Sequence, residues 1–183
     1  MLSPLFLLVA VAVRLDSRGP ALFRQERLGR DRRPFRVAKF RTMRMDASDE
    51  AHRAYIAQLA AGEVMGDGLR KLTDDPRVTR VGRVLRATSL DELPQLLNVV
   101  AGDMSLIGPR PALQYELEHY ASHHFERFAV RPGMTGLWQV SGRAEVGFTE
   151  MLELDVEYAR SHGPLLDLTI LLKTPGALIG RTA

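Results

Sequence analysis

The apolar stretch from Pro4 to Val13 constrains the fold of this chain more than any other feature. All ten residues are apolar, and the run stops at Arg14. As a helix, ten residues extend about 15 Å, roughly half of the hydrocarbon thickness of a bilayer. The run is therefore too short to cross a membrane by itself. It can be a buried core helix, a fragment of a signal peptide, or half of a membrane element that enters and leaves on the same side.

The flanking residues favour the third of these interpretations. A signal peptide is disfavoured because no basic residue precedes the run and no small-residue cleavage site follows it. From Arg14 to Arg44 the chain carries eleven Lys and Arg residues against three acids, a local charge of +8. The anionic cytoplasmic leaflet attracts such a combination of an apolar segment and a dense cationic stretch. We therefore expect a partial re-entrant membrane helix over 1–16 and a cytoplasmic-face domain over 17–183.

Length and composition narrow the classes of protein. A chain of 183 residues buries one core and contains no cysteine, which excludes disulfides, thiolate metal sites and a cysteine nucleophile. Of its 25 cationic residues 22 are arginine. Arginine suits bidentate binding of phosphate, although a GC-rich genome produces the same bias.

Local patterns predict an α+β fold that is mainly α. Residues 21–26 and 35–40 are short and β-prone, and the turn-like segment 28–34 between them predicts a β-hairpin. Residues 46–62, 112–128 and 150–160 read as amphipathic helices. The C-terminal segment 164–175 is too interrupted to span a membrane and suits a helix that lies flat at the interface or covers the core.

The acidic pair Asp91 and Glu92 lies at the start of an apolar segment. Ser89 followed by Glu92 is the pattern of a capping box and predicts a helix that begins at Ser89. Pro94 complicates this start, because a proline at that depth removes a backbone hydrogen bond and shifts or kinks the helix toward Leu93. Taken alone, the two carboxylates need do no more than cap the helix.

Arginines surround the acidic pair in the sequence. Six cations lie just upstream of it: Arg70, Lys71, Arg77, Arg80, Arg83 and Arg86. From residue 77 onward arginine recurs at every third position, so on a helix these side chains form one basic stripe. Such a stripe is ordinarily a solvated face, yet this one also delivers positive charge to the acidic pair.

Two loops after the acidic pair hold further arginines. Two glycines and two prolines between Gly102 and Pro111 indicate a stiff loop that fixes the angle of Arg110. We favour an anion contact for this arginine. A second glycine-rich loop over 131–143 contains Arg131, Arg143 and Trp138, and this tryptophan either packs beneath the loop or anchors at a membrane interface.

The motif inventory leaves phosphoryl chemistry as the best fit. The sequence contains no phosphate-binding P-loop, nucleophile elbow or dinucleotide-binding glycine motif. His119, His123 and His124 lack the HExxH arrangement, so we expect a solvated face there rather than a metal site. A carboxylate can attack phosphorus and hold a phosphoryl group covalently, while arginines and a divalent metal neutralise the transferring group. Magnesium needs only one or two carboxylates besides substrate phosphates, and Asp91 and Glu92 can supply them.

These residues also carry a resemblance to a known family. The chain resembles the bacterial sugar transferase family, the monotopic phosphoglycosyl transferases that act on polyprenyl phosphate. The similarity covers nearly the whole chain through these segments: Ser3-Pro4, Lys39-Phe40-Arg41-Thr42-Met43, residues 75–82, Ser89-Leu90-Asp91-Glu92-Leu93-Pro94-Gln95, Gly102-Asp103-Met104-Ser105, Gly108-Pro109-Arg110-Pro111, Arg131-Pro132-Gly133 and residues 139–143.

The resemblance implies an activity and a set of site residues. It implies a magnesium-dependent enzyme that moves a sugar-1-phosphate from a nucleotide diphosphate sugar, most commonly a UDP-hexose, to undecaprenyl or another polyprenyl phosphate in exopolysaccharide, capsule or O-antigen assembly. The implied route passes through a phosphoglycosyl-aspartate at Asp91, and Glu92 completes the dyad in metal binding or in handling the acceptor's proton. Arg110 matches the phosphate-contacting arginine of the family. Weaker substrate-binding roles fall to Lys39, Arg41, Arg131 and Arg143.

The resemblance also implies a location and one departure. It places the protein on the cytoplasmic face of the bacterial inner membrane, in one leaflet, without nucleic acid and with a homo-oligomer allowed. Family members begin with a longer apolar helix before the Ser-Pro break, so this sequence is a truncated form, has a misassigned start, or belongs to a member whose missing half lies upstream of Met1. The competing hypothesis is a non-catalytic basic module that binds a membrane surface or nucleic acid. Two observations count against this hypothesis. Such a module has no use for Asp91 and Glu92, and the aromatic residues of this chain are not interleaved with its cations as stacking platforms would be.

Overall fold

The computed structural model describes residues 3–44, 50–62, 77–141 and 147–179. Its α-helices and strands, in chain order, are α1 (Ser3–Asp16), β1 (Leu22–Leu28), β2 (Pro34–Phe40), α2 (Glu50–Ala60), α3 (Arg80–Thr88), α4 (Gln95–Ala101), β3 (Ser105–Ile107), β4 (Gly133–Thr135), α5 (Leu137–Ser141), α6 (Phe148–Ser161) and α7 (Pro164–Ile179). Short 3-10 helices join them: η1 (Arg30–Arg32), η2 (Leu90–Glu92), η3 (Gln114–His119) and η4 (Ser122–Ala129).

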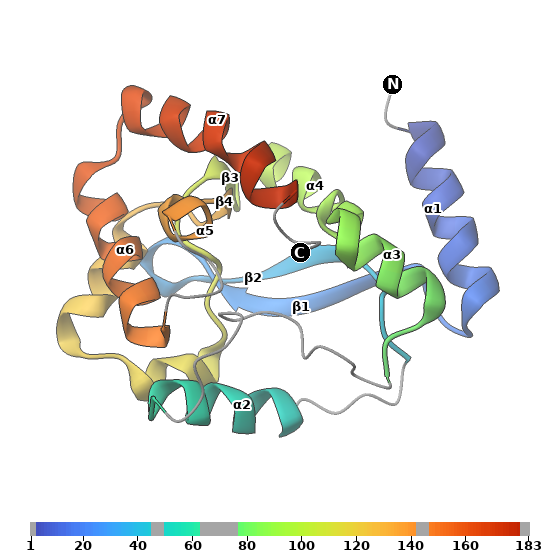
Figure 1. The fold of residues 1–183 in the computed structure, drawn as a ribbon, viewed down its shortest axis with the longest axis horizontal. Coiled ribbons are helices and arrows are strands. Elements are labelled where there is room, and N and C mark those ends of the chain that lie inside the picture. Colours follow the sequence, from blue (N-terminus) through green and yellow to red (C-terminus); the bar gives the residue numbers. More distant parts are fainter. Residues whose placement is uncertain (1–2, 45–49, 63–76, 142–146, 180–183) are drawn as a thin grey trace.

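The β1–β2 hairpin runs through the middle of the molecule, with α2 on one side and α3, α4 and α7 on the other (Figure 1). The strands pair antiparallel from Leu22 opposite Phe40 to Leu28 opposite Pro34. Their connection uses two left-handed residues, Asp31 at φ 55° and Arg32 at φ 59°. The structure therefore confirms the predicted hairpin. It was predictable because local sequence patterns indicate both its strands and its turn.

Helix α1 packs one face on the hairpin and α3 and exposes the other. Val9 and Val13 are buried against Phe40 and Leu85. Burying a valine contributes roughly 1.5–3 kcal/mol, so two valines hold this helix firmly. Its opposite face exposes Leu7, Leu8 and Leu15. Within the described residues, none of the helices combines the length and the apolar character needed to cross a bilayer.

A second core joins three helices at the other end of the hairpin. Ile56 of α2, Trp138 of α5 and Phe148 and Leu152 of α6 form this cluster. Trp138 is 7% exposed, so it packs in the core and is not a membrane anchor. This answers the question that the sequence left open for the tryptophan.

The segment predicted as one helix over 112–128 is instead two 3-10 helices, η3 and η4. Tyr120 stands between them in an extended conformation, with φ −90° and ψ 130°. Each 3-10 helix has its own N-terminal acceptor: Glu116 Oε2 accepts from Leu113 N at 3.1 Å, and His124 Nδ1 accepts from Ala121 N at 3.0 Å. Two separate caps favour two short helices over one long one.

A short parallel pair, β3 with β4, lies beside α4 and α7. Ser105 pairs with Gly133 and Ile107 with Thr135. The backbones meet so closely that a Cβ atom on Gly133 would lie 2.1 Å from the amide nitrogen of Gly108. Glycine is therefore required here for close approach of the backbones, and this contact fixes the loop that carries Arg110.

Candidate active site

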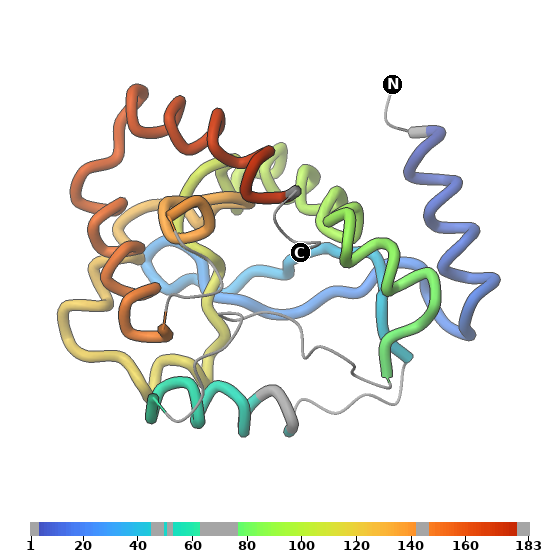
Figure 2. Tube along the Cα trace, in the orientation of Figure 1, coloured from blue at the N-terminus to red at the C-terminus, as the bar shows by residue number. Residues whose placement is uncertain are grey.

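The acidic pair lies on η2, a single 3-10 turn between α3 and α4. In Figure 2 the trace follows α3, η2 and α4 as one green run along the hairpin. The predicted capping box is wrong. Ser89 ends α3 in a left-handed conformation, with φ 58°, and its side chain caps nothing. An N-cap residue needs an extended backbone, so Ser89 cannot both end α3 and cap the start of the next helix. Helix α4 begins only at Gln95, after Pro94.

Apolar neighbours anchor the turn. Leu90 and Leu93 pack against the core cluster of Val9, Val13, Phe40 and Leu85. Their spacing of three residues places both on one side of a 3-10 turn. Asp91, between them, keeps 4% of its surface exposed, whereas Glu92 is half-buried. The turn is therefore held rigidly, and of the two carboxylates Glu92 is the more accessible.

Strand β2 places a cation beside Glu92. Lys39 Nζ lies 3.4 Å from Glu92 Oε1, and both side chains are partly exposed. The contact is long for a charge-assisted hydrogen bond, which is ordinarily about 2.7–2.9 Å. The structure thus brings together Lys39 and Glu92, two residues 53 positions apart in the sequence.

Asn98 of α4 is hydrogen-bonded to the backbone of strand β2, which carries Lys39. Its Oδ1 accepts a hydrogen bond from Ala38 N at 3.0 Å, and its Nδ2 donates to Arg36 O at 2.8 Å. The side-chain amide of Asn98 therefore pairs with backbone N–H and C=O groups at the outer edge of β2, as a neighbouring strand would. Because Lys39 follows directly on this edge, Asn98 sets its position relative to the acidic pair. The sequence gives no signal for this contact, which joins residues about 60 positions apart.

Helix α3 carries Arg80, Arg83 and Arg86 of the predicted basic stripe, whereas Arg77 precedes the helix. Arg80 and Arg83 are exposed, whereas Arg86 Nε donates to Thr42 Oγ1 at 2.9 Å. The helix approaches this segment so closely that a Cβ atom on Gly82 would lie 2.1 Å from Thr42 O. Arg70 and Lys71 lie outside the described residues.

The structure gives Arg41 a position that favours a structural role over the predicted substrate contact. Arg41 is 3% exposed. Its guanidinium donates to Pro20 O and Ser17 Oγ at 2.7 Å and to the carbonyl oxygens of Ser17 and Arg18 at 2.9 Å. These acceptors follow the C-terminus of α1, where a cation also offsets the helix dipole. Arg41 thereby ties α1 to the hairpin.

Arg110 makes its ion pair with Glu116. Its Nη1 lies 3.0 Å from Glu116 Oε1, and the arginine side chain is 18% exposed. Burial alone would raise the pKa of Glu116, but the charges of Arg110, Arg27 and Arg127 outweigh it and hold that pKa below its ordinary value. The predicted anion contact of Arg110 stays a prediction. Arg131 is exposed next to β4, and Arg143 lies outside the described residues.

A buried ion pair that the sequence did not reveal lies behind Arg110. Arg127 and Asp155 are both almost fully buried and joined through Asp155 Oδ2. Arg127 also donates to Tyr120 Oη and to Arg110 O, each at 2.7 Å. Burial raises the pKa of Asp155, although Arg127 opposes that shift. The paired residues lie 28 positions apart on different helices, and neither stands in a recognisable motif.

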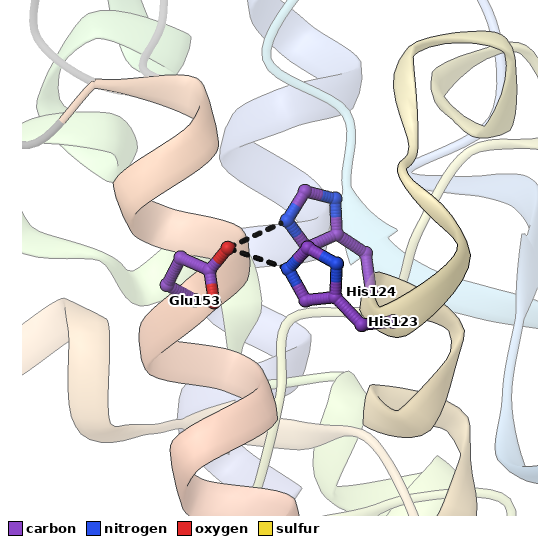
Figure 3. A group of neighbouring side chains, drawn as sticks. All are labelled: His123, His124 and Glu153. Atoms are coloured by element: carbon purple, nitrogen blue, oxygen red, sulfur yellow. Dashed lines mark hydrogen bonds and ion pairs between the residues drawn. The ribbon is translucent and has the colours of Figure 1, made fainter.

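The predicted solvated face is confirmed for His119 and His123, which are exposed, but not for His124. His123 and His124 meet Glu153 of α6 (Figure 3), with their Nε2 atoms 2.6 and 3.0 Å from Glu153 Oε1. His124 is buried rather than solvated. Its Nδ1 accepts from Ala121 N, so the neutral ring carries its proton on Nε2 and donates it to Glu153. A metal at that Nε2 would need the lone pair there and would set an N–H against an N–H at Ala121.

Among the described residues this cluster is the one group of three potential metal ligands. Two imidazoles and one carboxylate do not suit magnesium, which prefers oxygen ligands. Asp91 and Glu92 offer hard oxygen donors on adjacent residues. Oxygen donors of this kind are the ligands that magnesium prefers.

Comparison with known proteins places this chain in a family. The model of the family described as bacterial sugar transferase matches residues 1–181. The exopolysaccharide production protein ExoY of Sinorhizobium fredii is 44% identical over 181 residues, which cover 98% of this chain and 80% of that protein.

Two further relatives are longer than this chain. UDP-glucose:undecaprenyl-phosphate glucose-1-phosphate transferase of Caulobacter vibrioides is 44% identical over 191 residues, covering 98% of this chain and 64% of that protein. Undecaprenyl-phosphate galactose phosphotransferase of Salmonella typhimurium is 42% identical over 179 residues, covering 98% of this chain and 37% of that protein. On the match of the family model and these identities, the chain belongs to the bacterial sugar transferase family.

Proposed function

We propose that this protein is an enzyme that transfers a sugar-1-phosphate from a nucleotide diphosphate sugar, a UDP-hexose, to polyprenyl phosphate in bacterial polysaccharide assembly. The observation that carries the proposal is the rigid η2 turn, which holds Asp91 next to Glu92 and places Glu92 beside Lys39 in a member of this family. The relatives whose names specify UDP-glucose and undecaprenyl phosphate support the choice of donor and acceptor.

The chemistry we propose has two displacements at one phosphorus atom. A carboxylate oxygen of Asp91 bonds to the phosphorus that carries the sugar, and the bond from that phosphorus to the nucleotide breaks, releasing nucleoside monophosphate. An oxygen of polyprenyl phosphate then attacks the same phosphorus. The Asp91 carboxylate leaves unchanged, and the sugar remains on a polyprenyl diphosphate. Because Asp91 is 4% exposed, the atoms that cover it must move when the donor binds.

Lys39 and Glu92, the charged residues at the turn, assist this reaction electrostatically. Lys39 holds Glu92 at 3.4 Å and supplies a positive charge close to the phosphates of the donor. Glu92 either helps to hold a magnesium ion or receives the acceptor's proton. Magnesium, when bound to the two carboxylates, supplies a positive charge that offsets the phosphate oxygens.

We also propose that one face of the protein lies on the cytoplasmic surface of the membrane, with α1 forming part of a re-entrant element. Strand β3 contacts both α4 and α7, and all three expose large apolar side chains. The most exposed are Val100 of α4 and Leu165 and Leu172 of α7. Adjoining apolar surface of this kind suits an interface with lipid, as do the many cations of 14–44.

Vesicle binding tests this orientation. Leu172→Glu places a charge on the apolar face of α7 and is expected to weaken binding to phosphatidylglycerol vesicles about tenfold or more, since a buried charge is costly there. Thr149→Glu, on the exposed surface of α6, is the matched control and should bind as the unmodified protein does. Equal binding by both variants would place the membrane on another face.

A donor screen tests the reaction. The protein is incubated with magnesium, undecaprenyl phosphate and one nucleotide sugar at a time, and the released nucleoside monophosphate is measured. We expect release with UDP-hexoses that depends on the lipid for sustained turnover. If no nucleotide sugar gives monophosphate above the level of a lipid-free blank, the proposed reaction is refuted.

A further inference from the structure

Arg110 is held at two points, its side chain and its backbone, by two buried charged residues. Glu116 binds the guanidinium, with 3.0 Å between Arg110 Nη1 and Glu116 Oε1. Arg127 binds the peptide, donating from Nη2 to Arg110 O at 2.7 Å. Such contacts remove rotamer freedom that a long exposed side chain ordinarily keeps.

Glu116 is itself immobile. The residue has no exposed surface, and each of its carboxylate oxygens accepts a separate hydrogen bond. Oε1 takes the Arg110 guanidinium, and Oε2 takes the backbone N–H of Leu113 at 3.1 Å. The carboxylate is thus fixed between the loop that carries Arg110 and the start of η3, and the nearby arginines keep its pKa low, so that it is ionised at neutral pH.

Arg127, which donates to Arg110 O, is in turn held by other residues. Asp155 accepts from its Nε and Nη2 atoms, and Tyr120 accepts from its Nη1. Both Arg127 and Asp155 are almost fully buried. A buried ion pair is a weak source of stability but a strong source of defined geometry, because each partner is costly to leave unpaired.

Among the described residues, the guanidinium of Arg110 uses only part of its hydrogen-bonding capacity. One of its nitrogen atoms donates to Glu116, and the side chain keeps 18% of its surface exposed. A guanidinium has five N–H donors in a rigid fork, so fixing one edge sets the direction of the others. A pre-oriented fork binds phosphate with little further loss of side-chain freedom.

We propose that Glu116 is a positioning residue of the transferase, which orients the guanidinium of Arg110 toward a phosphate group of the substrate. The inference rests on the proposed transfer and on the phosphate contact that the sequence predicts for Arg110. Glu116 touches no substrate in this account. Its effect on the reaction passes entirely through Arg110, and that is the property an experiment can isolate.

A double-mutant cycle on kcat/KM for the nucleotide sugar tests this dependence. Glu116→Gln keeps the size of the side chain but loses its charge and one of its two acceptor oxygens, and we expect it to lower kcat/KM about tenfold. In the Arg110→Met background the same change should lower kcat/KM less than about twofold, because its target is absent. Glu118→Gln, an exposed neighbour on η3, is the control and should not change kcat/KM.

Independent losses that multiply in the double variant would overturn the proposal and make Glu116 a structural residue only. Should Glu116→Gln fail to fold, Glu116→Asp takes its place in the cycle, since it keeps the charge and moves it by one methylene. If Arg110→Met leaves kcat/KM unchanged, the phosphate role of Arg110 and this inference both fail. The proposed transfer through Asp91 is then still intact, because it is measured by variants at Asp91.

Discussion

The pair Lys39 and Glu92 and the pair Arg127 and Asp155 show two uses of charge in one small protein. Lys39 and Glu92 are partly exposed and 3.4 Å apart. Arg127 and Asp155 are buried, and the guanidinium of Arg127 also binds Tyr120 and the backbone of Arg110. An exposed, loosely joined pair contributes little to stability, whereas breaking a buried one is costly. In the proposed function the first pair holds charge for the substrate, whereas the second pair keeps the geometry of the buried interior defined.

The largest expected effect lies in the acidic turn and concerns activity. Asp91→Asn removes the proposed nucleophile and should lower sugar-phosphate transfer by about a thousandfold or more, measured as released nucleoside monophosphate. Glu157→Gln, an exposed carboxylate on α6, is the control and should keep full activity. Vesicle binding of Asp91→Asn should be unchanged. Turnover by this variant near the unmodified rate would remove Asp91 from the mechanism.

The buried pair should show the opposite behaviour, a large effect on stability. Arg127→Met leaves the Asp155 carboxylate in the interior without its cation, so the free energy of unfolding should fall by about 3–5 kcal/mol in urea titrations. Combining it with Asp155→Leu should recover part of that loss, because the unpaired charge is then gone. A loss for Arg127→Met below about 1 kcal/mol would contradict the contrast between the two regions.

Acid sensitivity gives a smaller effect in the buried region. The pKa of Glu116 is lower in the folded protein than its ordinary value of 4.5, so the unfolded chain binds the proton first as the pH falls. Its contribution to stability is complete above that ordinary value and is lost as the pH falls through the lower, folded value. Relative to Glu116→Gln, the unmodified protein should therefore lose more stability between neutral and strongly acidic pH in urea titrations. Parallel profiles would refute this.

The smallest expected effect is on stability in the exposed pair. Lys39→Met breaks a partly exposed contact and should change the free energy of unfolding by less than about 1 kcal/mol. Transfer activity should nonetheless fall about tenfold, since the cation near the donor phosphates is lost. A large loss of stability with unchanged turnover per folded molecule would place Lys39 with the structural charges.

Local features of this fold were predictable from the sequence, and distant contacts were not. The hairpin and α6 follow from strand, turn and helix patterns within a few residues. The capping box at Ser89 failed because the same residue already ends α3, which the four-residue pattern does not reveal. The single helix over 112–128 failed because Tyr120 interrupts it.

The candidate site divides in the same way. The acidic pair was visible as a motif, and its neighbour Lys39 as a motif position. Arg41 shares that motif but binds the end of α1, a contact that depends on how α1 meets the hairpin. Glu116, Arg127 and Asp155 carry no motif, so tertiary structure alone reveals them. Sequence patterns therefore indicated the candidate catalytic residues more readily than the residues that support them.

The covalent step at Asp91 is tested most directly by mixing the protein with the nucleotide sugar in the absence of polyprenyl phosphate. The account predicts a single burst of nucleoside monophosphate, no larger than the amount of enzyme, together with a sugar-phosphate adduct on the peptide that contains Asp91. Asp91→Asn should show neither. Release of monophosphate only when the lipid acceptor is present, with no adduct on the protein, would contradict the account and indicate a single direct displacement.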